Sequence, residues 1–160
     1  MLHRKKLSKE QALQKLRQYC AYQERSHSEV KEKAYSFGLW KNQVEELLSE
    51  LIQDGYLNEE RFAIAFAGGK FRMKQWGRVK IKYALKQKQV SDYCIRKALK
   101  EIGEEDYEKT FMLVAEKRWN SIKGAGVNSF VKMSKTREYL LQKGFEAVLI
   151  NRFINEQSKK

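Results

Sequence analysis

An apolar frame recurs three times along this chain, and it constrains the fold more than any other feature. The first copy has apolar side chains at positions 30, 34, 39, 44, 47 and 48. Moving it by 51 residues gives positions 81, 85, 90, 95, 98 and 99, and by a further 55 gives positions 136, 140, 145, 150, 153 and 154. Only Thr136 is polar among these eighteen positions. The spacing is helical, with one five-residue step that crosses a turn, so the frame predicts tandem helical units that stack on their neighbours.

Composition supports an all-α fold built of three tandem three-helix repeats. The 160 residues include no proline, and Leu, Lys, Glu, Gln and Ala fill long stretches, so nothing interrupts helix formation. Each unit of about fifty residues is too small to be very stable alone, so stacked units predict an elongated, curved body. The expected segments are a basic N-terminal tail (1–7) and repeats one to three at 8–57, 58–103 and 104–160.

Capping signals predict where the helices begin. Ser8 has Gln11 at the capping-box position, and Asn58 precedes two glutamates that suit the positive end of the helix dipole. Glycines such as Gly38, Gly55 and Gly144 are expected just past helix ends. The other expected helix starts are at Ser26 or Ser28, residue 78, Ser91, Asp106 and Ser134.

The charge balance favours an anionic partner. The formal net charge is +13, and it is uneven: residues 1–57 carry 10 basic and 8 acidic side chains, residues 58–103 carry 12 and 4, and residues 104–160 carry 11 and 8. The middle repeat therefore holds most of the excess, which favours nucleic acid or an acidic protein surface. No apolar run approaches the roughly 20 residues needed to span a membrane, and we expect no membrane association.

Enzymatic chemistry is not supported by the residues. His3 and His27 have no partners at ligand or triad spacing, and the acidic cluster at 104–108 suits the first turn of a helix without a metal. We therefore expect no enzymatic activity, no cofactor and no metal. Cys20 and Cys94 are far apart, and the N-terminus has no apolar segment typical of a signal peptide, so the expected location is the reducing cytoplasm.

The candidate binding residues lie between Lys70 and Lys88, a window without an acidic residue. Their ammonium and guanidinium groups can pair with phosphates, and the rings of Phe71 and Trp76 can stack on bases, although a place in the core is an alternative for both rings. Short helices joined by tight turns also allow a helix-turn-helix protein that reads duplex DNA. The candidate contacts are Lys70, Arg72, Lys74, Arg78, Lys82 and Lys86.

The sequence Tyr-Leu-Asn-Glu-Glu-Arg-Phe-Ala at 56–63, followed by Gly77 and a basic amphipathic helix with Leu85, resembles the RecX family. The likeness extends from about Ser8 to Asn155. It implies a structural role for the signature residues Tyr56, Leu57, Asn58, Arg61, Phe62, Ala63, Gly77 and Leu85. One departure is at Gln89, where the family usually has glycine, so the geometry of this turn is an open question.

The resemblance implies a function as well as a fold. RecX proteins consist of three three-helix units, bind RecA filaments on single-stranded DNA, and inhibit RecA ATPase, strand exchange and co-protease activities. A similar protein is a regulator of DNA repair and the SOS response that acts as a monomer with the RecA filament and single-stranded DNA as partners. The alternative is a helical nucleic-acid-binding protein that acts by direct DNA binding.

Overall fold

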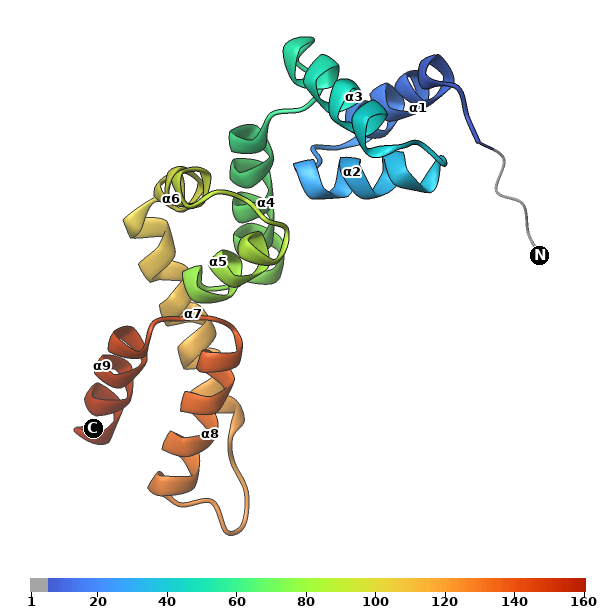
Figure 1. The fold of residues 1–160 in the computed structure, drawn as a ribbon. Coiled ribbons are helices and arrows are strands. Elements are labelled where there is room, and N and C mark those ends of the chain that lie inside the picture. Colours follow the sequence, from blue (N-terminus) through green and yellow to red (C-terminus); the bar gives the residue numbers. More distant parts are fainter. Residues whose placement is uncertain (1–5) are drawn as a thin grey trace. The chain divides into compact units, whose positions relative to one another are not determined.

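The computed structural model describes residues 6–160, and this range forms nine α-helices and no strand (Figure 1). The predicted all-helical class is therefore confirmed for the described part of the chain. Within it, no helix is both long and apolar enough to cross a lipid bilayer. The helices are α1 (Lys9–Tyr22), α2 (His27–Ser36), α3 (Lys41–Gln53), α4 (Glu59–Lys74), α5 (Arg78–Gln87), α6 (Asp92–Lys100), α7 (Glu104–Ser121), α8 (Ser129–Gln142) and α9 (Ala147–Ser158).

The predicted caps begin the helices of the N-terminal half. The Ser8 hydroxyl accepts the backbone N–H of Gln11 at 3.2 Å, and the Gln11 side chain accepts the N–H of Ser8 at 3.0 Å. Ser26, rather than Ser28, caps α2 through the same reciprocal pair with Glu29. These bonds satisfy backbone donors that have no partner inside the helix.

The repeated frame is present in the packing as well as in the sequence. Seventeen of its eighteen positions are buried, and Leu99 is half-buried. Even the polar exception, Thr136, is fully buried. The frame therefore identifies the core positions of all three repeats.

The turns inside the repeats share a left-handed residue. Gly38, Gln89 and Gly144 have φ values of +83°, +61° and +92°, and they are related by the same shifts of 51 and 55 residues that relate the frame. Glycine adopts this conformation readily, whereas a residue with a Cβ does so at a cost. The missing glycine at position 89 therefore leaves the turn unchanged, with Gln89 held in the unfavourable conformation.

Two predicted helix starts are wrong. Helix α8 begins at Ser129, capped by the Asn128 side chain, which accepts the N–H of Val131 at 2.9 Å; Ser134 lies inside the helix. Helix α7 begins at Glu104 rather than Asp106. In both cases the helix starts earlier than predicted, and the residue before it has an extended backbone: Gly103 before α7 and Asn128 before α8.

The predicted loose tail is only partly described. Its residues 1–5 lie outside the described range. Leu7 donates its backbone N–H to the carbonyl of Phe37 at 3.1 Å and packs against the core formed by the first three helices. The chain is therefore anchored before α1 begins.

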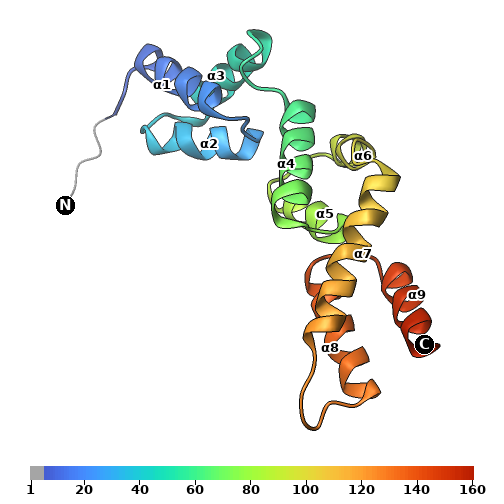
Figure 2. The ribbon, with the colours of Figure 1, turned by 180° about the vertical axis from the view of Figure 1, so that it is seen from behind.

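The chain divides into two compact units, one comprising residues up to Phe66 with Leu85–Ala98, and the other comprising Ala67–Ala84 with Leu99–Lys160. Helices α1, α2 and α3 pack together in the first unit. In the second, α8 lies beside α7 in both views (Figures 1 and 2) and also packs on α9. Aromatic rings fill this core, with Phe111 contacting Phe145 and Phe153 at centroid distances of 5.2 and 6.3 Å. The elongated, curved body stays a prediction.

Candidate functional site

The family-signature residues at the start of α4 stabilise the turn between α3 and α4. The Asn58 side chain accepts the N–H of Arg61 at 2.9 Å and caps α4 as predicted. Arg61 donates to the carboxylate of Glu24 at 2.5 Å and to the carbonyl of Gly55 at 3.0 Å, which ties the start of α4 to two earlier segments. Tyr56 is partly exposed. The other signature side chains of this stretch are buried, which suits a structural role: Leu57, Phe62, Ala63 and Leu85.

Gly77 is required by a close approach between two turns of the second unit. Its N–H donates to the carbonyl of Lys143 at 2.7 Å, and the N–H of Val79 donates to the carbonyl of Gly144 at 2.9 Å. A Cβ at position 77 would overlap the backbone of Gly144. We call this contact the second joint and define it by Gly77, Val79, Lys80, Lys143 and Gly144.

Arg78 is held within the protein by two carboxylates and a ring, and its role as a RecA or DNA contact stays a prediction. Its guanidinium donates to Glu146 at 2.9 Å and to Glu104 at 2.6 Å, and it lies 3.7 Å from the ring centroid of Tyr107. The side chain is 22% exposed. Both carboxylates come from beyond the basic window, so the local sequence could not show that this charge is neutralised.

Tyr107 completes this polar cluster. Its hydroxyl accepts the backbone N–H of Arg78 at 2.9 Å and donates to the carboxylate of Glu146. Burial, and then the hydrogen bond to Glu146, raise the pKa of Tyr107 above its ordinary value. The phenol therefore stays protonated and links α5, α7 and the start of α9.

The two predicted stacking rings differ. Phe71 is 7% exposed and packs on the ring of Tyr107 at a centroid distance of 5.8 Å, so the interior alternative is correct for it. Trp76 is half-buried, and the ammonium groups of Lys70 and Lys80 lie 5.0 and 4.6 Å from its ring centroid. Trp76 therefore lies at the surface within a cationic cluster.

The remaining predicted cations are exposed. Four of them have no carboxylate within 4.0 Å among residues 6–160: Arg72, Lys74 and Lys82 on the second unit, and Lys86 on the first. Their charges are therefore available to a partner.

Three surface residues of the second unit were missed. Tyr83 is 65% exposed beside Lys82, and Lys80 lies in the basic window but off the stripe of residues 78, 82 and 86. Lys143 is distant in sequence, although the 55-residue shift relates it to Lys88. The repeat frame was therefore the signal that could have found it.

Lys143 is held among other cations. Its ammonium donates to the carbonyl of Lys74 at 2.7 Å. Burial, then the charges of Lys80 and Lys74, lower the pKa of Lys143. This end of the second unit therefore concentrates positive charge that no carboxylate of the described chain offsets.

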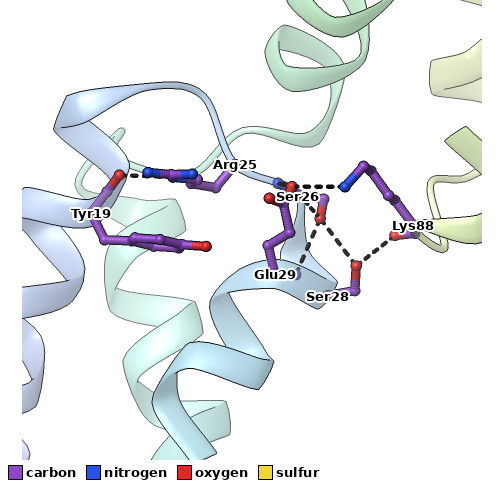
Figure 3. A network of polar contacts seen from close by, with 6 residues as sticks. All are labelled: Tyr19, Arg25, Ser26, Ser28, Glu29 and Lys88. Atoms are coloured by element: carbon purple, nitrogen blue, oxygen red, sulfur yellow. Dashed lines mark hydrogen bonds and ion pairs between the residues drawn. The ribbon is translucent and has the colours of Figure 1, made fainter. Parts of the chain in front are cut away.

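A corresponding contact, the first joint, lies within the first unit and is defined by Ser26, Ser28, Glu29 and Lys88 (Figure 3). The hydroxyl of Ser28 donates to the carbonyl of Lys88 at 2.8 Å. The carboxylate of Glu29 accepts the N–H of Ser26 at 3.1 Å and pairs with the ammonium of Lys88 at 3.7 Å. Opposite charges therefore close the first joint.

Metal and thiol chemistry have no support in the described residues. Across residues 6–160, no three His, Cys, Asp or Glu side chains gather in a way that could hold a metal ion. Cys20 and Cys94 are buried free thiols. Glu104, from the acidic cluster, heads α7 and pairs with Arg78.

The apolar frame occurs three times, and each copy contains a turn with a left-handed residue at the same position. Together with the two corresponding joints, these features define a tandem helical-repeat protein. Residues 58–99 match the family model of the second three-helix domain of RecX, and residues 104–154 match that of the third. The chain belongs to the RecX family.

Individual relatives agree with this assignment. The regulatory protein RecX of Clostridium perfringens (strain 13 / Type A) is 30% identical over 122 residues, which are 76% of this chain and 57% of that protein. The regulatory protein RecX of Bacillus cytotoxicus is 28% identical over 140 residues, 86% of this chain and 50% of that protein. The chain thus spans about half the length of the curated relatives it matches.

The fold is shared with a solved structure. The crystal structure of RecX from Lactobacillus salivarius superposes with a TM-score of 0.82 at 23% sequence identity, covering 95% of this chain and 97% of that one.

Proposed function

We propose that this protein is a non-enzymatic regulator that binds RecA filaments on single-stranded DNA and inhibits the ATPase, strand-exchange and co-protease activities of RecA. The observation that carries the proposal is the pair of consecutive matches to the second and third RecX domains. The exposed cations without a carboxylate neighbour, Lys74 and Lys82 among them, support an anionic partner. We further propose that it acts in the cytoplasm as a monomer of three repeats, at 8–57, 58–103 and 104–160.

The test is the ATPase activity of RecA on single-stranded DNA, with this protein titrated in below one molecule per RecA. A regulator that acts on the assembled filament inhibits at substoichiometric amounts. Inhibition only in excess, relieved by more DNA, would contradict the proposal and indicate competition for DNA.

A charge-reversal pair locates the surface. Lys74→Glu with Lys82→Glu changes two exposed cations that make no ion pair, so the fold is expected to persist while inhibition is lost. The matched control, Lys117→Glu with Lys159→Glu, makes the same charge change at exposed positions and is expected to keep inhibition. Equal inhibition by both variants would remove Lys74 and Lys82 from the proposed surface.

Direct DNA binding is the second candidate, and the exposed ring of Tyr83 beside Lys82 favours it. A ring and a neighbouring ammonium can engage a base and its phosphate on a single strand. This function predicts strong affinity for bare single-stranded DNA with a steep salt dependence, whereas the filament regulator binds RecA-coated DNA more tightly than bare DNA.

A further inference from the structure

The first and second joints occupy equivalent places in the repeat. The 51-residue shift takes Ser26 to Gly77 and Glu29 to Lys80, and the 55-residue shift takes Lys88 to Lys143. In both joints, a residue at the start of one repeat's middle helix donates a hydrogen bond to a carbonyl just after the middle helix of the next repeat. In the first joint, Ser28 of α2 donates to the carbonyl of Lys88 after α5. In the second, Gly77 before α5 donates to the carbonyl of Lys143 after α8. Each joint lies within one compact unit.

The charges of the two joints differ. In the first, the carboxylate of Glu29 lies against the ammonium of Lys88. In the second, Lys80 replaces the glutamate while Lys143 keeps the positive charge, so a pair of opposite charges becomes a pair of like charges. Neither lysine has a carboxylate within 4.0 Å in the described chain. The second joint therefore lacks the anion that closes the first.

The fold brings the backbone of Lys80 against Gly144, the residue that follows Lys143. The Cβ of Lys80 lies against Gly144, where any side chain would overlap it. Lys143 is anchored by one hydrogen bond to the carbonyl of Lys74, which leaves further N–H donors on its ammonium group. Lys80 on α5 and Lys143 at the C-terminal cap of α8 therefore meet at one joint, where an oxyanion would accept from both ammonium groups.

The neighbouring rings favour a nucleic-acid strand as the source of that oxyanion. Trp76, in the turn before α5, contacts the ammonium of Lys80. Tyr83 lies three residues after Lys80 on α5, so Lys80 and Tyr83 are neighbours on one face of that helix. An acidic protein surface would pair with the ammonium groups, and a tyrosine ring can pack in a protein interface as well. A single strand uses both, through its phosphates and its bases.

We propose that the second joint binds a phosphodiester group of single-stranded DNA between Lys80 and Lys143, in the place that the Glu29 carboxylate occupies in the first joint. The proposal deepens the proposed function, because it names the chemical group that this surface takes when the protein acts on a DNA-containing filament.

Lys80→Glu in the full chain is the decisive variant, because it installs the charge pair of the first joint. The variant is expected to fold, with a melting temperature at least equal to that of the unchanged protein. Its affinity for a fluorescently labelled oligothymidylate, measured by anisotropy, is expected to fall about tenfold or more, with a shallower salt dependence. Lys80→Arg keeps the charge and is expected to bind within about twofold of the unchanged protein.

Lys117→Glu is the matched control, since it makes the same charge change at an exposed position of α7. It accounts for the effect of net charge alone. Equal losses for Lys80→Glu and Lys117→Glu would overturn the site. Should Lys80→Glu fail to fold, Lys80→Gln removes the charge without adding a carboxylate, and a loss of about threefold or more beyond the control is expected.

Two further measurements identify the ligand. Displacement of the oligonucleotide by millimolar inorganic phosphate, beyond the effect of chloride at equal ionic strength, would make the free ion the ligand and overturn the assignment to a strand. Unchanged oligonucleotide binding by Lys80→Glu, with loss of binding to DNA-free RecA, would assign the site to an acidic protein surface and overturn it also. Either result leaves RecA inhibition by the unchanged protein intact, so the failure of this site and of the proposed function are distinguishable.

Discussion

Gln89→Gly is expected to stabilise the protein, although glycine usually destabilises. Gln89 has a φ of +61° at the position where the other two repeats have Gly38 and Gly144. A left-handed conformation costs a residue with a Cβ roughly 1–2 kcal/mol, and glycine loses roughly 0.5–1 kcal/mol more conformational freedom on folding. The difference predicts a gain of about 0.5–1 kcal/mol in the free energy of unfolding. For a chain of this length, the melting temperature is expected to rise by about 1–4 °C.

The measurement is urea unfolding followed by circular dichroism, with the melting temperature as a second readout. Gln14→Gly, at an exposed position inside α1, is the control and is expected to destabilise by about 1 kcal/mol, because it places glycine in a helix interior. Opposite signs for the same substitution would establish that backbone conformation decides the effect. A lower free energy of unfolding for Gln89→Gly would refute the reasoning. It would mean that the contacts of the Gln89 side chain stabilise the protein by more than its left-handed backbone destabilises it.

Two further predictions concern buried polar groups. The hydroxyl of Thr136 is buried without a hydrogen-bond partner, so Thr136→Val, which keeps the shape, is expected to raise the free energy of unfolding by about 1 kcal/mol in urea titration; lower stability would mean that the hydroxyl has a partner. The raised pKa of Tyr107 means that the folded state holds its proton more tightly than the unfolded chain does. The free energy of unfolding that Tyr107 contributes is fully present below the ordinary tyrosine pKa of 10.0 and is lost as the pH rises above that value toward the raised pKa of the folded state. Stability is therefore expected to fall more steeply between about pH 10 and 11 in the unchanged protein than in Tyr107→Phe; parallel curves would contradict this.

The core could be predicted from the sequence because burial repeats along it. Residues such as Leu85 and Phe153 stand at frame positions, and helical spacing alone places them inside. Local hydrogen bonds were equally visible, since the Ser8 cap depends on a residue only three positions away. Where the relevant partner is near in sequence, the pattern is sufficient.

The candidate site was predicted less well because its partners are distant. Arg78 lies in a window without acidic residues, yet Glu104 and Glu146 neutralise it from 26 and 68 positions away. For Phe71 the local sequence left base stacking and a place in the core both open, and the ring of Tyr107, 36 positions away, is what covers it. Composition within a window cannot show which charges the fold brings together.

The boundaries of the two compact units have a consequence for any attempt to divide this protein. The units separate within α4, α5 and α6, so the middle repeat contributes residues to both. A cut between repeats, before residue 58, would deprive α1–α3 of Leu85–Ala98, and with it the partner of Ser28. The segment that repeats along the sequence is therefore not the compact unit of the structure. Removing one repeat should expose a surface on each remaining piece, because each compact unit includes part of the middle repeat.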